Sequence, residues 1–214
     1  DLNITQGEMN QINKYKKDVD GVTGKNTPNV TQYGLVHLDG TQATTYARIR
    51  KLSGDDFKRA SRQRIVLQAM LEKAKKANPA TLVKICNSVV DDISTTLSLD
   101  QMVSLAKDVT KYKISSTTGF PTDLTTKNMP RCGDTVIPAD LVTNVKKLHE
   151  YMFDDATYTP SQTVQAISDT IVNTTGITAD SAKINTSDYN ETVGATGTDE
   201  IQKGSETTGG TNVQ

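Results

Sequence analysis

The chain has 214 residues, of which 35% are hydrophobic, so it can bury one sizeable core with little left for a second domain. Its formal net charge of −1 conceals an asymmetry: residues 1–153 carry 22 Lys and Arg against 16 Asp and Glu, whereas residues 154–214 carry 2 against 9. No apolar run approaches the roughly 20 residues of a membrane-spanning helix, which excludes such a span within this sequence.

The first predicted elements are the end of a strand and a helix. Leu2 and Ile4 alternate with polar residues as in a strand. Thr5 follows as a helix N-cap, and Glu8, three residues later, completes a capping box. Because the chain begins inside an element, we expect it to be a fragment of a longer protein or a processed product.

The basic middle of the chain is predicted to form two helices joined by a loop. The first helix starts near Asp39 or Thr41 and ends around residues 48–51, where a Leu-Ser-Gly-Asp segment follows. The second is the longest helix signal in the chain, at residues 56–77, with Asp56 as its N-cap.

The remaining elements alternate between helices and short strands. Apolar residues at helical spacing predict helices, and β-branched residues bounded by Gly and Pro predict strands. This alternation favours a layered α/β domain with helices on both faces of a sheet. The predicted helices are 79–98, 98–112 with Ser98 as N-cap, 138–153 and 159–176, and the predicted strands are 112–121 and 134–138.

We expect three parts along the chain. Residues 1–153 form the main domain, and residues 154–184 form a helical extension packed on it. Residues 185–214 are rich in Thr, Gly and Glu and have no apolar periodicity. Such a segment buries too little surface to offset the entropy of ordering it, so we expect a disordered tail.

The cysteines and histidines do not indicate a site of their own. Cys86 and Cys132 lie 46 residues apart and form no CxxC pair, which argues against zinc and thioredoxin-like sites. They are either buried free thiols or one disulfide. His149 lies beside the apolar stripe of its helix and is predicted to be a residue at the edge of the core.

Five arginines fall within residues 46–64, "YARIRKLSGDDFKRASRQR". On a helix at about 100° per residue, Arg59 and Gln63 fall on the same stripe as Val66 and Met70. A solvated basic face would lie opposite the apolar stripe, whereas here polar residues continue it. We therefore expect this helix to pack on the core through its later turns and to line a cleft with its first turns.

The other polar residues of this helix are assigned to different sides. Arg62 lies just beside the Arg59 stripe and is predicted to face the core. Ser61 and Arg64 lie on the opposite face, and Arg64 is predicted to face solvent.

Arg48 and Arg50 lie where a helix is expected to fray into a loop, so both can turn toward one ligand. Guanidinium groups bind phosphate oxygens with two parallel hydrogen bonds, and several of them beside a helix N-terminus suit a diphosphate. One alternative is a solvated surface with ion pairs to Asp39, Asp55 and Asp56. Another is a nucleic-acid patch, which a pI of about 6.2 and the lack of interleaved aromatic residues disfavour.

Two blocks in this region match a known pattern. The chain reads "HLDGTQATTYARIR" and then "GDDFKRASRQRIVLQAM", where the pattern has "LdG-q-A-l-Y-aRiR", a short loop and "gD-f-Ra-RQ". Further on, "GFP", "VIPADLVTNVKKLHEYMF" and "YTPSQTVQAIS" match the region that follows. On these motifs, over about residues 1–175, the chain resembles the LytR-CpsA-Psr family of cell-wall glycopolymer transferases.

The resemblance implies an α-β-α sandwich, of which this chain is the C-terminal portion. Such enzymes bind a polyprenyl (undecaprenyl) pyrophosphate with its tail in an apolar tunnel and its diphosphate at the mouth with Mg²⁺. They are phosphotransferases that move an anionic glycopolymer, such as wall teichoic acid or capsular polysaccharide, from this carrier to peptidoglycan. The expected location is the extracytoplasmic face of a bacterial membrane or the cell wall, in a Gram-positive organism, with a membrane anchor outside this fragment.

The same resemblance assigns the site residues. Arg48, Arg50 and Arg59 are expected to be catalytic by neutralising charge on the diphosphate. The diphosphate contacts are expected to be these three residues together with Arg62 and Gln63.

The metal site is expected to lie elsewhere. Asp56 matches the Asp of the second block, but the Mg²⁺ ligands of the family correspond to residues upstream of Asp1. Two alternatives to transfer therefore stay open, namely a non-catalytic module that binds the lipid carrier or the polymer, and a pyrophosphatase.

Overall fold

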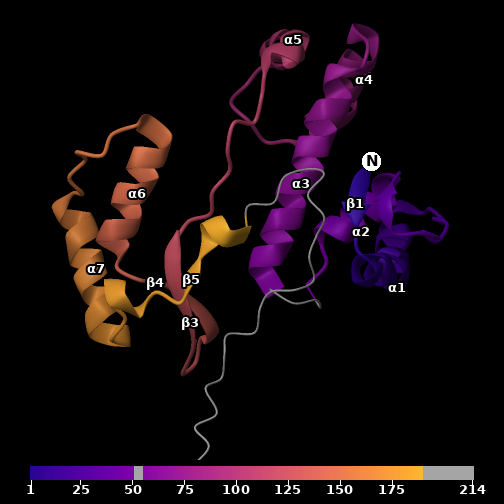
Figure 1. The fold of residues 1–214 in the computed structure, drawn as a ribbon. Helices are drawn as coiled ribbons and strands as arrows, with labels where there is room; N and C mark the ends of the chain where they lie inside the picture. The colour runs from indigo at the N-terminus through magenta and orange to yellow at the C-terminus, as the bar shows by residue number, and fades with distance from the viewer. Residues whose placement is uncertain (51–54, 190–214) are drawn as a thin grey trace, which may run out of the picture. The chain divides into compact units, whose positions relative to one another are not determined.

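The computed structural model describes residues 1–50 and 55–189, which form two compact units divided after Thr110 (Figure 1). Each unit combines helices with a small antiparallel sheet, which confirms the predicted α/β class. The predicted domain boundaries at residues 153 and 184 both fall inside the second unit.

The first unit begins with strand β1 (Leu2–Ile4) and helix α1 (Gln6–Thr23). The N–H of Glu8 donates to Thr5 Oγ1 at 3.1 Å, and the N–H of Thr5 donates to the Glu8 carboxylate at 3.0 Å. This confirms the predicted capping box. The helix ends at Gly24, whose φ of +67° is the left-handed conformation that favours glycine at this position.

Strand β2 (Gly34–Val36) pairs antiparallel with β1 and leads into helix α2 (Gly40–Ala47). The Asp39 carboxylate accepts the N–H of Gln42 at 2.8 Å, which confirms the predicted start of this helix. Helix α3 (Asp55–Lys75) packs against α2 and β1. The elements enclose a core made of Leu2, Ile4, Ile12, Val30, Val36, Tyr46, Ile49 and Ile65, with Met9, Leu38, Val66 and Ala69 packed around it.

The packing face of α3 differs from the predicted one. Ser61, Arg62 and Ile65 are 1%, 5% and 7% exposed, whereas Met70 is 60% exposed. The prediction that Ser61 lies opposite the core was therefore wrong, and so was the assignment of Met70 to the packing stripe. The periodicity misplaced Ser61 and Met70 because it ranked side chains by polarity. The prediction that Arg62 faces the core is confirmed, since Arg62 is buried with a charged partner of its own. Arg64, predicted to face solvent, is half-buried.

Polar groups on α1 hold the loop that follows it. Asn13 Nδ2 donates to the Val30 carbonyl and Asn13 Oδ1 accepts the Val30 N–H, both at 2.8 Å. Lys16 Nζ donates to the carbonyl of Thr27. Asp20 accepts hydrogen bonds from the Thr27 hydroxyl at 2.6 Å and the Thr27 N–H at 3.0 Å. The hydrogen bond from the Thr27 side chain is the main cause of a lowered pKa for Asp20, although burial acts in the opposite direction.

The first unit ends with helices α4 (Pro79–Val89) and α5 (Leu99–Lys107), which pack against each other. Ser98 caps α5 in a capping box with Gln101, as predicted for this position. Among the helices of the described chain, none is both long and apolar enough to cross a membrane. Both cysteines are free: Cys86 is half-buried and Cys132 is exposed.

The second unit contains a sheet in the order β4-β3-β5, formed by β3 (Asp123–Met129), β4 (Gly133–Pro138) and β5 (Ile184–Asn185). The predicted strand at 134–138 is confirmed as β4. The predicted strand at 112–121 is wrong, because strand pairing begins only at Asp123. The earlier segment has no apolar face to bury, since its Ile114 is 40% exposed, whereas Leu124 of β3 is fully buried.

Helices α6 (Leu141–Phe153) and α7 (Gln162–Thr175) pack against each other, confirming two predicted helices. His149 is half-buried and stacks on Tyr158 with ring centroids 3.3 Å apart, as expected of a residue at the edge of a core.

The start of the predicted disordered tail is ordered. Ile184–Asn185 pairs with β3, and Thr186–Tyr189 forms a 3-10 turn. The N–H of Thr186 donates to the Thr122 carbonyl at 2.8 Å. Residues 190–214, which make up the rest of that predicted tail, lie outside the described part of the chain.

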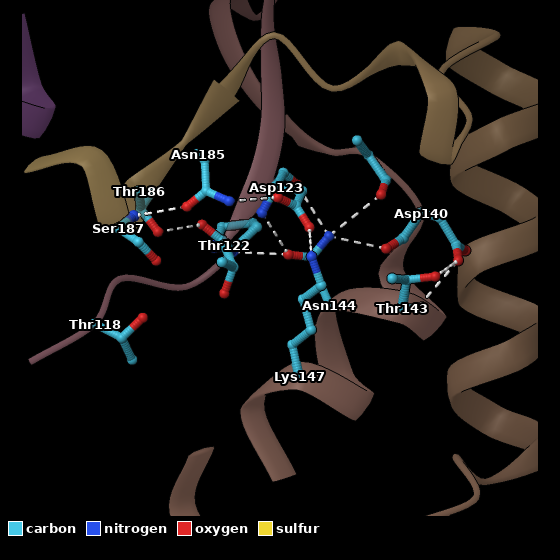
Figure 2. Close-up of polar contacts among 12 residues, drawn as sticks. Thr118, Thr122, Asp123, Asp140, Thr143, Asn144, Lys147, Asn185, Thr186 and Ser187 are labelled. Carbon is cyan, nitrogen blue, oxygen red and sulfur yellow. Dashed lines mark hydrogen bonds and ion pairs between the residues drawn. The ribbon is translucent and has the colours of Figure 1, made fainter. Parts of the chain in front are cut away.

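Asn144 is the polar centre of the second unit (Figure 2). Its side chain is fully buried in the first turns of α6. Oδ1 accepts the N–H of Thr122 at 2.7 Å and that of Asp123 at 2.9 Å, and Nδ2 donates to the carbonyls of Asp123 and Asp140, both at 2.9 Å. One amide therefore joins the start of β3 to the β4–α6 turn.

Replacing Asn144 with Ala leaves the N–H groups of half-buried Thr122 and Asp123 without their acceptor. We expect the free energy of opening of β3 to fall by about 2–4 kcal/mol, because each unsatisfied buried group costs about 1–3 kcal/mol. Native-state hydrogen exchange of the β3 amides measures this. Asn173→Ala, at an exposed position of α7, is the matched control and should leave that exchange unchanged. Equal effects of the two variants would contradict the role of Asn144.

Asp140 precedes α6 with a φ of +64° and caps it. Burial of its carboxyl acts to raise the pKa, but hydrogen bonds from the side chains of Thr143 and Ser168 and from the N–H groups of Thr143 and Val142 lower it below the usual value. The ionised form is thus favoured in the folded state.

Asp140→Asn keeps a residue that tolerates positive φ and caps helices but removes the charge. Because the folded-state pKa is lowered, the stabilisation from ionised Asp140 is present above the unfolded pKa of about 3.9 and is lost as the pH falls through the folded value. We expect the wild-type chain to be more stable than the variant at pH 6, with the difference shrinking below about pH 4. Thermal unfolding from pH 6 to pH 3 tests this, with exposed Asp180→Asn as control. A difference independent of pH would contradict it.

Candidate functional site

A pocket of about 190 Å³ opens on the first unit between α1 and the end of α2. Helix α1 contributes Tyr15, Asp18 and Val19. The end of α2 and the residues after it contribute the rest of the lining, which is Thr45, Arg48, Ile49 and Arg50.

The local backbone explains how two arginines spaced i, i+2 reach one pocket. Helix α2 ends at Arg48, and its last turn tightens: the N–H of Arg48 donates to the Thr45 carbonyl at 3.1 Å and that of Ile49 to the Tyr46 carbonyl at 3.2 Å. Tyr46 and Ile49 are only 2% and 4% exposed. These two anchors leave Arg48 and Arg50 on the exposed side.

The charges and walls of the pocket suit an anion with an apolar neighbour. The lining residues include two arginines and one carboxylate residue, Asp18, so the charged lining has an excess of positive charge. Within the described residues, the Arg48 side chain makes no hydrogen bond or ion pair, so its donors are available to a ligand. Val19, Ile49 and the Tyr15 ring supply apolar surface beside the arginines.

The other predicted diphosphate contacts lie on α3 and do not line this pocket. Arg59 is half-buried, and Gln63 is exposed. Arg62 is buried, with its Nε 2.7 Å from a Glu8 carboxylate oxygen. The side chain of Asp56 lies outside the described part of the structure.

The residues that the structure describes contain no ready-made cluster of metal ligands. None of their His, Cys, Asp and Glu side chains form a group of three or more that could hold a metal ion. The pocket contributes one carboxylate, that of Asp18, and Mg²⁺ is commonly held by one or two carboxylates together with waters and substrate phosphates.

Tyr15, Asp18 and Val19 were missed at the level of sequence. Their spacing of i, i+3 and i+4 places them on one face of α1, which was a usable signal. What the sequence lacked was the information that this face meets the end of α2, which is a long-range contact.

The arginines should differ in chemical reactivity. Labelling the folded chain with phenylglyoxal, followed by mass spectrometry, should modify exposed Arg48 at about ten times the rate of Arg62 or more, because Arg62 reacts only when its surroundings open. Arg131, exposed in the second unit, is the reference for an accessible arginine. Similar rates for Arg62 and Arg131 would contradict the burial described here.

Comparison with known proteins supplies the family. No curated protein and no solved structure matches the chain. A family model, described as the LytR_cpsA_psr family, matches residues 6–148, which is more than half of the chain and includes the pocket and all of α3. The chain therefore belongs to the LytR_cpsA_psr family, whose members function with cell-wall glycopolymers in the cell envelope.

Proposed function

We propose that this chain is part of a phosphotransferase that moves an anionic glycopolymer, such as wall teichoic acid or capsular polysaccharide, from polyprenyl pyrophosphate to peptidoglycan. The observation that carries the proposal is the pocket that Arg48 and Arg50 line together. The proposed location is the extracytoplasmic face of a Gram-positive cell membrane, with the polyprenyl carrier and peptidoglycan as partners.

The arginine pair suits a diphosphate better than an isolated carboxylate. Each guanidinium presents a planar fork of donors that can bind two phosphate oxygens, and two such forks can serve both phosphates. The apolar lining beside them, Val19 and Ile49, suits the first carbons of a lipid chain. A pocket of about 190 Å³ accommodates a head group and leaves the polymer and the lipid tail outside.

In the proposed reaction, a hydroxyl oxygen of peptidoglycan attacks the phosphorus that carries the glycopolymer. The P–O bond between the two phosphates breaks, polyprenyl phosphate leaves with the electron pair, and the proton of the hydroxyl passes to water. Negative charge grows on the leaving phosphate. Arg48 and Arg50 would stabilise that charge, which is the main contribution that a protein makes to phosphoryl transfer.

Arg59, Gln63 and Mg²⁺ belong to the same proposal through family resemblance. Arg59 and Gln63 lie on α3, and their contact with a diphosphate stays a prediction. The Mg²⁺ ligands are proposed to lie upstream of Asp1.

Arg48→Ala tests the proposal directly. We expect the affinity for inorganic pyrophosphate, measured by isothermal titration calorimetry, to fall by about 10- to 100-fold, because a hydrogen bond to a charged group contributes about 1.5–3 kcal/mol. Geranyl pyrophosphate should behave in the same way, since it adds a short lipid tail to the same head group.

Arg131→Asn is the matched control. It removes one exposed positive charge from the second unit, and Asn tolerates the φ of +70° at this position. Its affinity for pyrophosphate should equal that of the wild-type chain. Loss of affinity in this control, or none in Arg48→Ala, would refute the site. Hydrolysis of geranyl pyrophosphate by the wild-type chain would instead favour a pyrophosphatase.

A further inference from the structure

The first unit contains an ion pair that the proposed reaction does not use. Arg62 of α3 and Glu8 in the first turn of α1 lie 54 residues apart in the chain, yet Arg62 Nε and Glu8 Oε1 are 2.7 Å apart. Both side chains are buried, with 6% and 9% of their surfaces exposed. The pair therefore lies in the interior between two helices.

Stability alone is a weak reason for such a pair. Removing two charges from water costs several kcal/mol per ion, and replacing a buried ion pair with apolar residues is often neutral or stabilising. What a buried pair does well is fix geometry, since a misplaced partner leaves a buried charge uncompensated. The question is which geometry this pair fixes.

The second contact of Arg62 answers it. Its Nη1 donates to the carbonyl oxygen of Ile49 at 3.5 Å, the long end of hydrogen-bond distances. Ile49 follows the last turn of α2, where carbonyl groups have lost their helical donors. It also stands between Arg48 and Arg50, so the guanidinium of Arg62 contacts the backbone that carries both pocket arginines.

The other end of the ion pair is equally fixed. Glu8 Oε2 accepts the N–H of Thr5 at 3.0 Å, and the Thr5 hydroxyl oxygen accepts the N–H of Glu8 at 3.1 Å. The capping box thereby sets the direction of the carboxylate that Arg62 meets. Glu8 and the pocket residues Tyr15 and Asp18 belong to the same helix, so the pair connects one wall of the pocket to the other.

We infer that Arg62 is a positioning residue, which holds the Arg48–Ile49–Arg50 segment against α1 by pairing with Glu8 and donating to the Ile49 carbonyl. Its own guanidinium is directed to Glu8 and not to a ligand. The expected effect of Arg62 on diphosphate affinity rests on the proposed function. Its effect on the position of the Arg48–Ile49–Arg50 segment does not.

Three variants separate positioning from stability. Arg62→Met leaves Glu8 as a buried unpaired charge. The double variant Glu8→Gln with Arg62→Met removes that charge, and Gln at this position still serves a capping box. Arg62→Lys keeps a charge that can pair with Glu8, but its single ammonium group lacks the fork that spans the carboxylate and the Ile49 carbonyl.

The readouts are thermal unfolding, hydrogen exchange of peptides covering residues 46–50, and pyrophosphate affinity by calorimetry. Arg62→Met should lower the unfolding temperature, and the double variant should recover most of that loss. All three variants should show hydrogen exchange at residues 46–50 about ten times faster than in the wild-type chain. Their affinity for pyrophosphate should be about three- to tenfold weaker. Arg62→Lys keeps the test available where Arg62→Met does not fold.

A surface ion pair on the same helix is the control. Lys75 Nζ lies 2.6 Å from a Glu72 oxygen, and Lys75→Met should change neither the exchange at 46–50 nor the affinity, because exposed pairs contribute little. Recovery of exchange and affinity together with stability in the double variant would overturn the inference. A wild-type chain that does not bind pyrophosphate would refute the proposed function, while the exchange at 46–50 would still decide the role of Arg62.

Discussion

The constraint on which the first unit depends is the burial of one positive charge. Arg62 lies in the interior, 5% exposed, next to a hydrophobic core of aliphatic residues and Tyr46. Its buried charge lies far in the sequence from the contacts that Lys16 and Asp20 of α1 make with Thr27. A guanidinium cannot lose its proton, so it is tolerated there only beside an oriented carboxylate. Glu8 provides that carboxylate because the capping box of α1 holds it in place. The first turn of α1 therefore both begins that helix and supplies the carboxylate that Arg62 of α3 needs in the interior.

The second unit also buries a polar side chain, but an uncharged one. Asn144 is fully buried and is saturated by backbone groups from the start of β3 and from the turn before α6. A neutral amide is sufficient there because it joins two backbone segments and faces no charged partner. In the first unit, the longer Arg62 side chain contacts both the Glu8 carboxylate and the Ile49 carbonyl.

Local chemistry was predictable and long-range chemistry was not. The N-caps at Thr5 and Ser98 and the helix start near Asp39 follow from residues within four positions of one another, and all three are confirmed. The arginine-rich blocks were equally readable, because their residue types and spacing carry the family pattern. The packing face of α3 was predicted only in part. Arg62 faces the core as expected, but polarity alone placed Ser61 on the wrong side, and no local signal in the sequence indicated that Glu8, 54 residues away, is the partner of Arg62.

The same distinction explains how two arginines come to line one pocket. Tyr46 and Ile49 bury themselves and leave Arg48 and Arg50 outward, so hydrophobic burial places two like charges on one short segment. Asp18 supplies one carboxylate among the lining residues, so the charged lining keeps an excess of positive charge. A chain with a net charge of −1 thus carries a pocket lined by two arginines, and the backbone carbonyl between them accepts a hydrogen bond from a third, buried arginine.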